Sequence, residues 1–310
     1  MSKAASILDA KLTYLYSRVG ASTVKLGLDT MRALVNVMGV DPLVLPCVHV
    51  AGTNGKGSVS AMLESVLRAS GLRTGLYTSP HLIRFNERIR VGGEMIPDAD
   101  LIRLLDDVER ADQQQAAAPG HRPGTFFELT TAVAFQWFLE RQVQLAVLET
   151  GMGGRLDSTN LIVPLVAVMT GIGLEHVGFL GNTLEQVASE KAGVIKPGRP
   201  VVVGRQHPAV RRIIEDQARA AGSPVLCAEE RVAVRRLSQN LDGQLISIET
   251  ADGPWPPLRL PLLGDFQLDN CALAVTALEW MRAELRLPLT PEAIRAGLEK
   301  TRWPARCQVV

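Results

Sequence analysis

Residues 48–58 read Val-His-Val-Ala-Gly-Thr-Asn-Gly-Lys-Gly-Ser, an apolar run followed by a glycine-rich loop, and a helical pattern opens directly after it. Glycines permit a tight turn in which consecutive N–H groups point at one anion. A helix beginning near Gly57 adds the positive end of its dipole. Lys56 supplies a mobile charge for the outer phosphates, and the Ser58 hydroxyl is placed to reach Mg²⁺. The stretch predicts a nucleoside-triphosphate site, for which ATP is the simplest occupant.

The spacing of this loop departs from the usual G-x-x-x-x-G-K-[ST] pattern. Val50 stands where the first glycine belongs, and Gly57 separates Lys56 from Ser58. An ordinary strand-to-helix turn is the alternative. We consider it weaker because the lysine stands where a phosphate requires it.

The composition is typical of a globular protein: of the 310 residues, 46% are hydrophobic and 21% are charged. A net charge of +1 gives no broad attraction to nucleic acid or to an acidic membrane, so neither is expected as a partner. No apolar run approaches the roughly 20 residues that span a bilayer, and no secretory leader is evident. The scattered cysteines are expected to be free thiols in a reducing cytoplasm: Cys47, Cys227, Cys271 and Cys307.

Apolar runs alternate with helical patterns through most of the chain. The expected strands are residues 43–50, 73–78, 143–149, 165–170 and 200–203. This alternation predicts an α/β fold with a doubly wound, mostly parallel sheet of the P-loop type. The pattern then changes, because residues 232–237, 245–249 and 258–262 are typical of a small antiparallel β-meander. Residues 266–285 and 291–300 are expected to be helices.

Polar residues follow several predicted strands, at the edge where open α/β sheets bind ligands. Ser79 follows the second strand, Glu149 ends the third, and His176 follows the fourth. Taken singly, a loop histidine or a glutamate at a strand end is more often a solvated group than a ligand. Together with the phosphate loop, they favour a Mg²⁺ site, with the Glu149 carboxylate as the best ligand. Imidazole is an unusual partner for so hard an ion.

At this point the sequence resembles the Mur ligase superfamily and, within it, folylpolyglutamate synthase and the bifunctional dihydrofolate synthase/folylpolyglutamate synthase. The resemblance runs through essentially the whole chain and is carried by several motifs in combination. They are residues 52–58, 79–82 with 86–89, 125–130, 149–160, 190–196 and 303–306.

The resemblance implies roles for individual residues. The implied ATP contacts are Asn54, Gly55, Lys56, Gly57, Ser58, Asn270 and Arg306. The implied ligands of one or two Mg²⁺ ions are Ser79, Glu149, His176 and Lys191, the last as a carbamate. Lys56, His176 and Lys191 are the implied catalytic residues. The implied pteroate-binding segments are Lys25, Leu26, Gly27 and Leu28; Thr125, Phe126, Phe127 and Glu128; and Leu156, Asp157 and Ser158.

A carbamylated lysine requires a neutral amine that attacks CO₂. At an ordinary pKa near 10.4 only about one amine in a thousand is neutral at physiological pH, and burial would raise that share. The alternative for Lys191 is a surface partner of a residue four positions away on its helix. Three residues depart from the usual family pattern, namely Glu175 for aspartate, Met152 for leucine and Lys25 for an acidic residue.

The resemblance also implies a domain organisation and a reaction. Residues 1–296 would form an ATP-binding domain of the Mur ligase central type with folate-binding segments, and residues 297–310 would lead into a C-terminal domain absent from this chain. The implied protein is a cytoplasmic monomer that joins L-glutamate to dihydropteroate or to a tetrahydrofolate through an acyl phosphate.

Three alternatives remain open. The first is a nucleotide- and pterin-binding module without turnover, and the second is a small-molecule kinase, which leaves residues 149–160 and Lys191 unexplained. The third is another Mur-type ligase acting on a cell-wall precursor. It would need a further domain ahead of the phosphate loop, where only about fifty residues precede, too few for a typical domain.

Overall fold

Six parallel strands form the body of an eight-stranded sheet in the computed structural model, which describes residues 3–19 and 27–305. The strand order is β4-β3-β2-β5-β1-β6-β7-β8. The parallel strands are β2 (Thr74–Tyr77), β5 (Leu145–Glu149), β1 (Cys47–Ala51), β6 (Val166–Met169), β7 (Val201–Val203) and β8 (Val225–Cys227). The hairpin of β3 (Ile89–Val91) and β4 (Glu94–Met95) adds an antiparallel edge. The predicted α/β class with a mostly parallel sheet is therefore confirmed.

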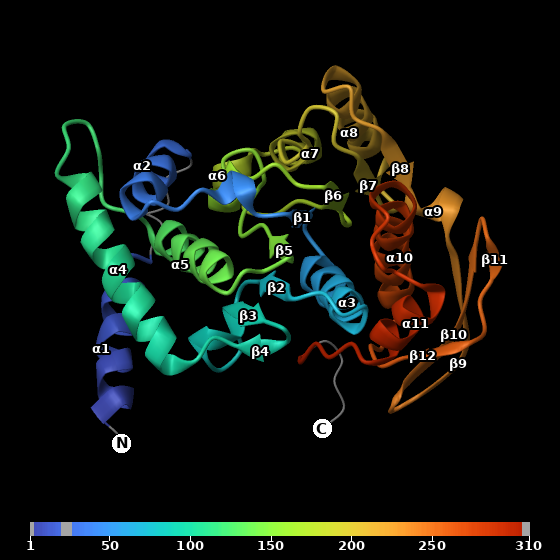
Figure 1. The fold of residues 1–310 in the computed structure, drawn as a ribbon. Helices are drawn as coiled ribbons and strands as arrows, with labels where there is room; N and C mark the ends of the chain where they lie inside the picture. The colour runs from blue at the N-terminus through green and yellow to red at the C-terminus, as the bar shows by residue number, and fades with distance from the viewer. Residues whose placement is uncertain (1–2, 20–26, 306–310) are drawn as a thin grey trace.

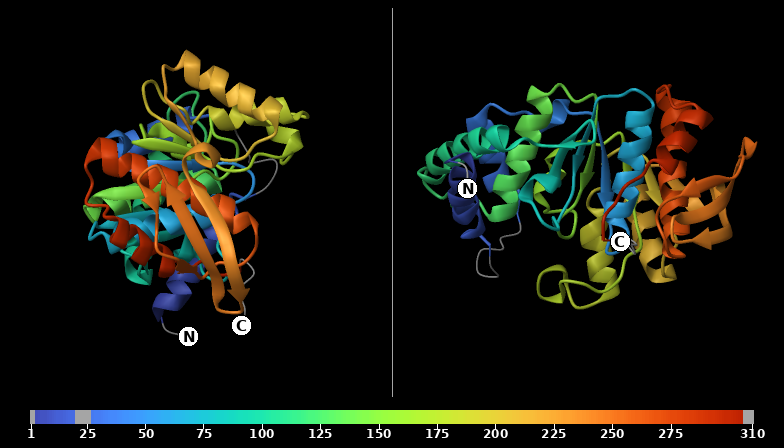
Figure 2. Two further views of the ribbon diagram at one scale, coloured as in Figure 1. Left: turned by 90° about the vertical axis from the view of Figure 1, so that its right-hand side faces the viewer. Right: turned by 90° about the horizontal axis from the view of Figure 1, so that it is seen from below.

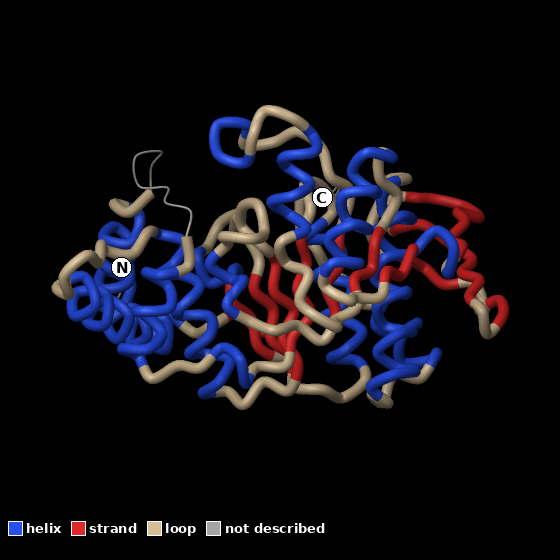
Figure 3. The backbone as a smooth tube through the Cα atoms, turned by 90° about the horizontal axis from the view of Figure 1, so that it is seen from above, coloured by secondary structure: helices blue, strands red, loops and turns tan. Residues whose placement is uncertain are grey.

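Helices cover both faces of this sheet (Figures 1 and 3). One face carries α3 (Lys56–Ala69), α10 (Phe266–Leu285) and α11 (Pro291–Glu299). The other carries two groups, the first being α1 (Lys3–Tyr16), α2 (Asp29–Met38), α4 (Asp98–Ala116) and α5 (Phe126–Glu140), and the second α7 (Leu184–Ala192) and α8 (Pro208–Ala220). The short helices are η1 (Pro42–Val44), η2 (Phe85–Arg88), η3 (Ser158–Leu161), α6 (Val177–Leu180) and α9 (Ala228–Arg231).

The strands are buried on both sides because their alternate residues enter different cores. On β5, Val147 packs with α3 and α10, whereas Ala146 and Leu148 pack with α5 and its neighbours. A strand that is apolar on both faces belongs at the centre of a sheet covered by helices. β1 lies between β5 and β6, so the order in which the chain adds strands reverses direction at β1. In open α/β sheets such a reversal creates a ligand-binding crevice at the carboxyl ends of the strands.

The predicted meander forms a second, antiparallel sheet on the outside of α10 (Figure 2). It consists of β9 (Ala233–Asn240), β10 (Gly243–Thr250), β11 (Gly253–Pro254) and β12 (Leu258–Leu260). Inward side chains such as Ile246 and Leu258 join the core around α10. The sheet therefore fixes α10 from the side opposite the main sheet.

One local prediction needs correction, and one strand was not predicted. Residues 42–44 form a 3₁₀ turn in place of the first part of the strand, because the Asp41 carboxylate accepts a hydrogen bond from the Leu43 N–H and Pro42 has no N–H to give. The three-residue strand β8 was not predicted, since so short an apolar run has no readable period.

Cys47, Cys227 and Cys271 are free and buried, as expected, and Cys307 lies outside the described residues. No helix in the described part of the chain has the length and apolar character to cross a membrane.

Candidate active site

A cavity of about 980 Å³ opens at the carboxyl ends of the central strands. The loops that follow β1, β2, β5 and β6 meet there with the start of α10. The lining residues include Asn54, Gly55, Lys56, Gly57, Ser58, Ser79, Glu149, His176 and Asn270. Residues from opposite ends of the sequence are thus brought to one edge of the sheet, where the topology favours a ligand.

The glycines of the phosphate loop are required by close contacts. A Cβ atom on Gly52 would lie 1.9 Å from the Thr170 Oγ1 atom, and one on Gly55 would lie 2.3 Å from the Asn270 Oδ1 atom. Gly55 also has a φ of +93°, a left-handed value that disfavours side chains. A Cβ atom on Gly57 would lie 2.8 Å from the Trp303 ring. Side chains are therefore excluded at these three positions, and a phosphate can approach the loop backbone closely.

Two lysine ammonium groups converge on one backbone carbonyl of this loop. Lys56 Nζ donates to the Gly52 carbonyl at 2.9 Å and to the Thr53 carbonyl at 3.2 Å. Lys191 Nζ donates to the same Gly52 carbonyl at 2.8 Å. Of the two, Lys56 lines the cavity, so its charge favours the approach of an anion to the loop.

Lys191 is buried behind the loop, with 1% of its residue surface exposed. Burial lowers the pKa of its amine, and the hydrogen bond to the neighbouring Glu175 carboxylate opposes that shift. The charge of Lys56 lowers the Lys191 pKa further. The burial of Lys191 therefore excludes the alternative in which this side chain pairs with another residue on the protein surface. Lys191 does not line the cavity itself.

Three of the four candidate metal ligands, Ser79, Glu149 and His176, line this cavity. Glu149 is buried, and its Oε2 atom accepts a hydrogen bond from the Ser79 N–H at 3.1 Å. The exposed His176 precedes α6 with a φ of +46° and lines the cavity. The burial of Glu149 excludes the reading of this carboxylate as a solvated loop charge.

The donor set suits Mg²⁺ bound together with a phosphate chain. Glu149 and Ser79 offer hard oxygen atoms, and among the described residues no cluster of three or more His, Cys, Asp or Glu side chains completes an all-protein shell. Mg²⁺ ordinarily keeps several waters and takes one or two carboxylates plus substrate phosphates. The residues present therefore fit a metal held jointly by protein, phosphate and water.

The predicted pteroate segments are only partly at the cavity. Thr125, Phe126, Phe127, Leu156, Asp157 and Ser158 line it. Gly27 and the buried Leu28 do not line it, nor does the buried Glu128. Lys25, Leu26 and Arg306 lie outside the described residues.

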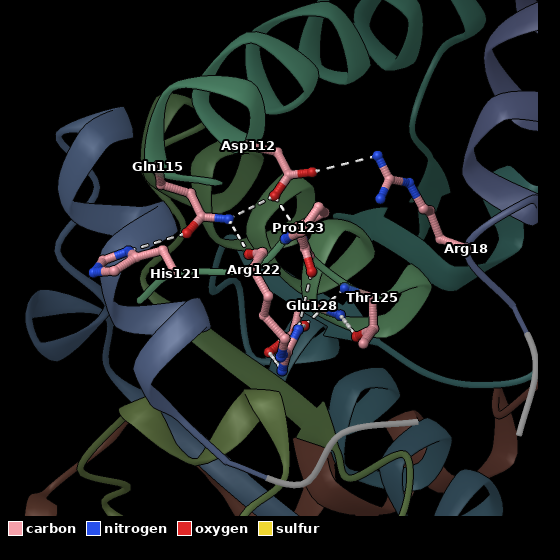
Figure 4. A network of polar contacts seen from close by, with 9 residues as sticks. Arg18, Asp112, Gln115, His121, Arg122, Pro123, Thr125 and Glu128 are labelled. Carbon is pink, nitrogen blue, oxygen red and sulfur yellow. Dashed lines mark hydrogen bonds and ion pairs between the residues drawn. The ribbon is translucent and has the colours of Figure 1, made fainter. Parts of the chain in front are cut away.

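Glu128 instead belongs to a polar network that supports the cavity wall (Figure 4). Its carboxylate accepts two hydrogen bonds of 2.9 Å from the Arg122 guanidinium and one of 2.7 Å from the Thr125 N–H. Asp112 accepts a hydrogen bond from the Gly124 N–H at 2.7 Å and lies 3.9 Å from the Arg18 guanidinium. The network fixes the turn that carries Thr125 and Phe126 into the cavity.

Two cavity arginines were missed by the sequence analysis. Arg18 and Arg88 both line the cavity. Arg88 is buried, donates to His81 Nδ1 at 2.7 Å and lies over the Phe126 ring at 5.1 Å. Its place in the motif of residues 86–89 was the available signal. Both side chains make this end of the cavity suitable for an anionic group beside an aromatic surface.

Asp157 organises the loop that follows β5. Its carboxylate accepts from the N–H groups of Gly151, Met152 and Thr159 at 2.9 Å each, and from the Thr159 hydroxyl. Burial raises the pKa of this carboxyl group, and these hydrogen bonds oppose the rise. The Thr159 hydroxyl, which donates to Asp157, also lies 2.8 Å from the buried His49 Nε2 atom. The loop is thereby tied to the central strand β1.

Comparison with known proteins gives a consistent result. Residues 50–278 match the model of the Mur ligase middle domain. The chain is 38% identical to the dihydrofolate synthase/folylpolyglutamate synthase of Bacillus subtilis, over 93% of this chain and 67% of that protein. It is 42% identical to the folylpolyglutamate synthase of Lacticaseibacillus casei, over 85% of this chain and 61% of that protein.

A solved structure described as an FPGS–AMPPCP–folate complex has the same fold. It superposes with a TM-score of 0.89 at 38% identity, covering 96% of this chain and 73% of that one. The chain thus spans about two thirds of the length of the proteins it matches.

Proposed function

The chain belongs to the Mur ligase family, among the folylpolyglutamate and dihydrofolate synthases, and from this membership we propose that it serves ATP-dependent ligation of L-glutamate to dihydropteroate, to a tetrahydrofolate (poly)glutamate, or to both. One observation carries the proposal. A single cavity joins the phosphate loop to the wall of Phe126 and Phe127. A relative with this fold was solved with an ATP analogue and folate together.

The proposed reaction has two steps. A carboxylate oxygen of the pterin-bearing substrate attacks the γ-phosphorus of ATP, and ADP leaves with the electrons of the broken P–O bond. The resulting acyl phosphate makes the carboxyl carbon a good electrophile. The amine of L-glutamate attacks that carbon through a tetrahedral intermediate, phosphate leaves, and the amine loses a proton as the amide forms.

In this scheme the protein aligns the reactants and neutralises charge. Asn54, Gly55, Gly57 and Ser58 would hold the phosphates, with Asn270 and Arg306 as further ATP contacts. Lys56 would place its charge on the outer phosphates. Ser79, Glu149 and His176 would hold Mg²⁺, which supplies charge neutralisation on the phosphate oxygens when bound.

For the folate side we propose the cavity-lining residues of the 125–127 and 156–158 segments, together with the segment 25–28 and Glu128. Residues 1–296 would act as the ATP-binding domain and residues 297–310 as the lead into a further domain. The monomeric state and the cytoplasmic location stay predictions.

The proposal is tested by ADP formation from Mg²⁺ and ATP, with dihydropteroate or tetrahydrofolate and with or without L-glutamate. Dependence on both the pterin and glutamate, together with a product heavier by one glutamate residue, is the expected result. Binding of AMPPCP and folate without any product would favour the alternative of a binding module without turnover. Failure to bind AMPPCP would contradict both.

We also propose that Lys191 is carbamylated when the site is active. Its burial lowers the amine pKa, so a larger share of the amine is neutral and able to attack CO₂ than in an exposed lysine. The carbamate would carry a negative charge, and its oxygens suit a metal ion.

The prediction for Lys191 follows from its lowered pKa. Because only the neutral amine reacts, the carbamate share at fixed dissolved CO₂ should rise as the pH increases from about 6 to about 8. Carbon-13 NMR of protein equilibrated with labelled bicarbonate should show one carbamate signal that Lys191→Ala abolishes and that Lys300→Ala, at an exposed position, retains. An unchanged spectrum in the Lys191 variant would contradict the assignment.

A further inference from the structure

The side chain of Gln267 connects α10 to the phosphate loop. Gln267 Nε2 donates to Ser58 Oγ at 3.2 Å, and Asn270 Nδ2 donates to Gln267 Oε1 at 2.9 Å. Gln267 is fully buried, and it is absent from the residues that line the cavity. Both of its neighbours do line the cavity.

The two neighbours are placed by this single amide. Gln267 and Asn270 are three residues apart on α10 and so share one face of the helix. An amide accepts at one end and donates at the other, and Gln267 uses both ends here. Because the Ser58 oxygen accepts from Gln267, the hydroxyl proton of Ser58 is left to point toward another acceptor.

A second glutamine holds the start of α10. The buried Gln244 on β10 donates through Nε2 to the carbonyls of Leu262 at 2.8 Å and Gly264 at 3.1 Å. The same Gly264 carbonyl accepts from the Gln267 N–H at 3.0 Å. Hydrogen bonds therefore run without a break from the outer antiparallel sheet, through the first turn of α10, to the phosphate loop.

We propose that Gln267 is a positioning residue for the nucleotide: it orients the Ser58 hydroxyl and the Asn270 amide toward the phosphate chain, and the antiparallel sheet holds it in register through Gln244. This deepens the proposed function and rests on it for the identity of the ligand. Gln267 itself would not touch the nucleotide, and it would act through Ser58 and Asn270.

The test is a double-mutant cycle on AMPPCP affinity, measured by calorimetry with Mg²⁺ on the full chain. Gln267→Met keeps the side-chain length and removes both hydrogen bonds, and we expect the Kd to rise about tenfold. In a Ser58→Ala/Asn270→Ala background the same change should raise the Kd less than about threefold, since the effect passes through these two side chains. Folate affinity should be unchanged in every variant.

Thr276→Val is the matched control. Thr276 is buried on the same helix and donates within it to the Ala272 carbonyl at 2.8 Å. The Thr276→Val variant should lose a comparable hydrogen bond, and its AMPPCP affinity should equal that of the wild type. Where Gln267→Met fails to fold, Gln267→Glu preserves the shape, cannot donate to Ser58 when ionised, and is expected to weaken AMPPCP binding at least tenfold.

The outcomes separate two failures. Equal AMPPCP affinity in wild type and Gln267→Met would overturn the positioning role and leave the proposed function intact. A full tenfold effect of Gln267→Met in the Ser58→Ala/Asn270→Ala background would do the same. Absence of AMPPCP binding by the wild-type chain would overturn the proposed function itself.

Discussion

Lys56→Ala is expected to weaken AMPPCP binding by on the order of 100-fold, the largest effect on affinity that we predict. The Lys56 ammonium lies in the cavity, 2.9 Å from the Gly52 carbonyl, so it needs only a small movement to reach a phosphate in the loop. A charge-assisted contact to phosphate in a partly enclosed site contributes about 3 kcal/mol, which corresponds to this factor. Calorimetry with Mg²⁺ and AMPPCP measures it.

Two controls accompany the Lys56 variant. Lys300→Ala removes an exposed lysine at the C-cap of α11 and should leave the affinity unchanged. Folate binding should survive in Lys56→Ala, since the wall of Phe126 and Phe127 is built by other segments. Wild-type affinity for AMPPCP in Lys56→Ala would show that the phosphate chain lies elsewhere.

The main sheet was predictable because its strands have a simple signature. Buried parallel strands are continuous apolar runs, and each is followed by a loop at the same edge. Val147 and its neighbours on β5 show this pattern, and so does β1. The order of the strands was not predictable, because no local pattern records that β5 and β6 pair with β1 on its two sides.

The candidate site was predictable where residues follow strands and not where they come from other elements. Ser79, Glu149 and His176 were found by their positions after strands, and the structure brings them to one cavity. Arg18, in the turn after α1, and Gln267, within α10, carry no such positional signal. A lone arginine is usually solvated, and a glutamine within a helix is usually a surface residue. Only their tertiary contacts reveal their surroundings.

In the phosphate loop, too, the sequence predicts a feature whose cause lies in tertiary contacts. Its glycines predicted a bare backbone, yet the reasons for three of them are distant side chains. Thr170 lies against Gly52, Asn270 against Gly55 and Trp303 against Gly57. The sequence distances between these pairs exceed one hundred residues, so the constraint belongs to the folded state and not to the loop.

Glu149→Gln is the second change with a large expected effect. The amide oxygen can still accept from the Ser79 N–H, so the local structure is preserved while one negative charge is lost. A neutral amide is a much weaker ligand for Mg²⁺ than a carboxylate. We expect Mg²⁺ to lose most of its stimulation of AMPPCP binding, and any ligase turnover to fall by about 10³-fold.

Glu140→Gln provides the matched control for the Glu149 variant. Glu140 ends α5, does not line the cavity and pairs with Arg103 near the surface, and the same substitution there removes the same charge. AMPPCP affinity is measured at increasing Mg²⁺ concentrations. The Glu140→Gln variant should follow the wild-type curve, and the Glu149→Gln variant should show a flattened curve. If the Glu149 variant instead followed the wild-type curve, the buried carboxylate would have no part in binding the metal, and its contact with Ser79 would be purely structural.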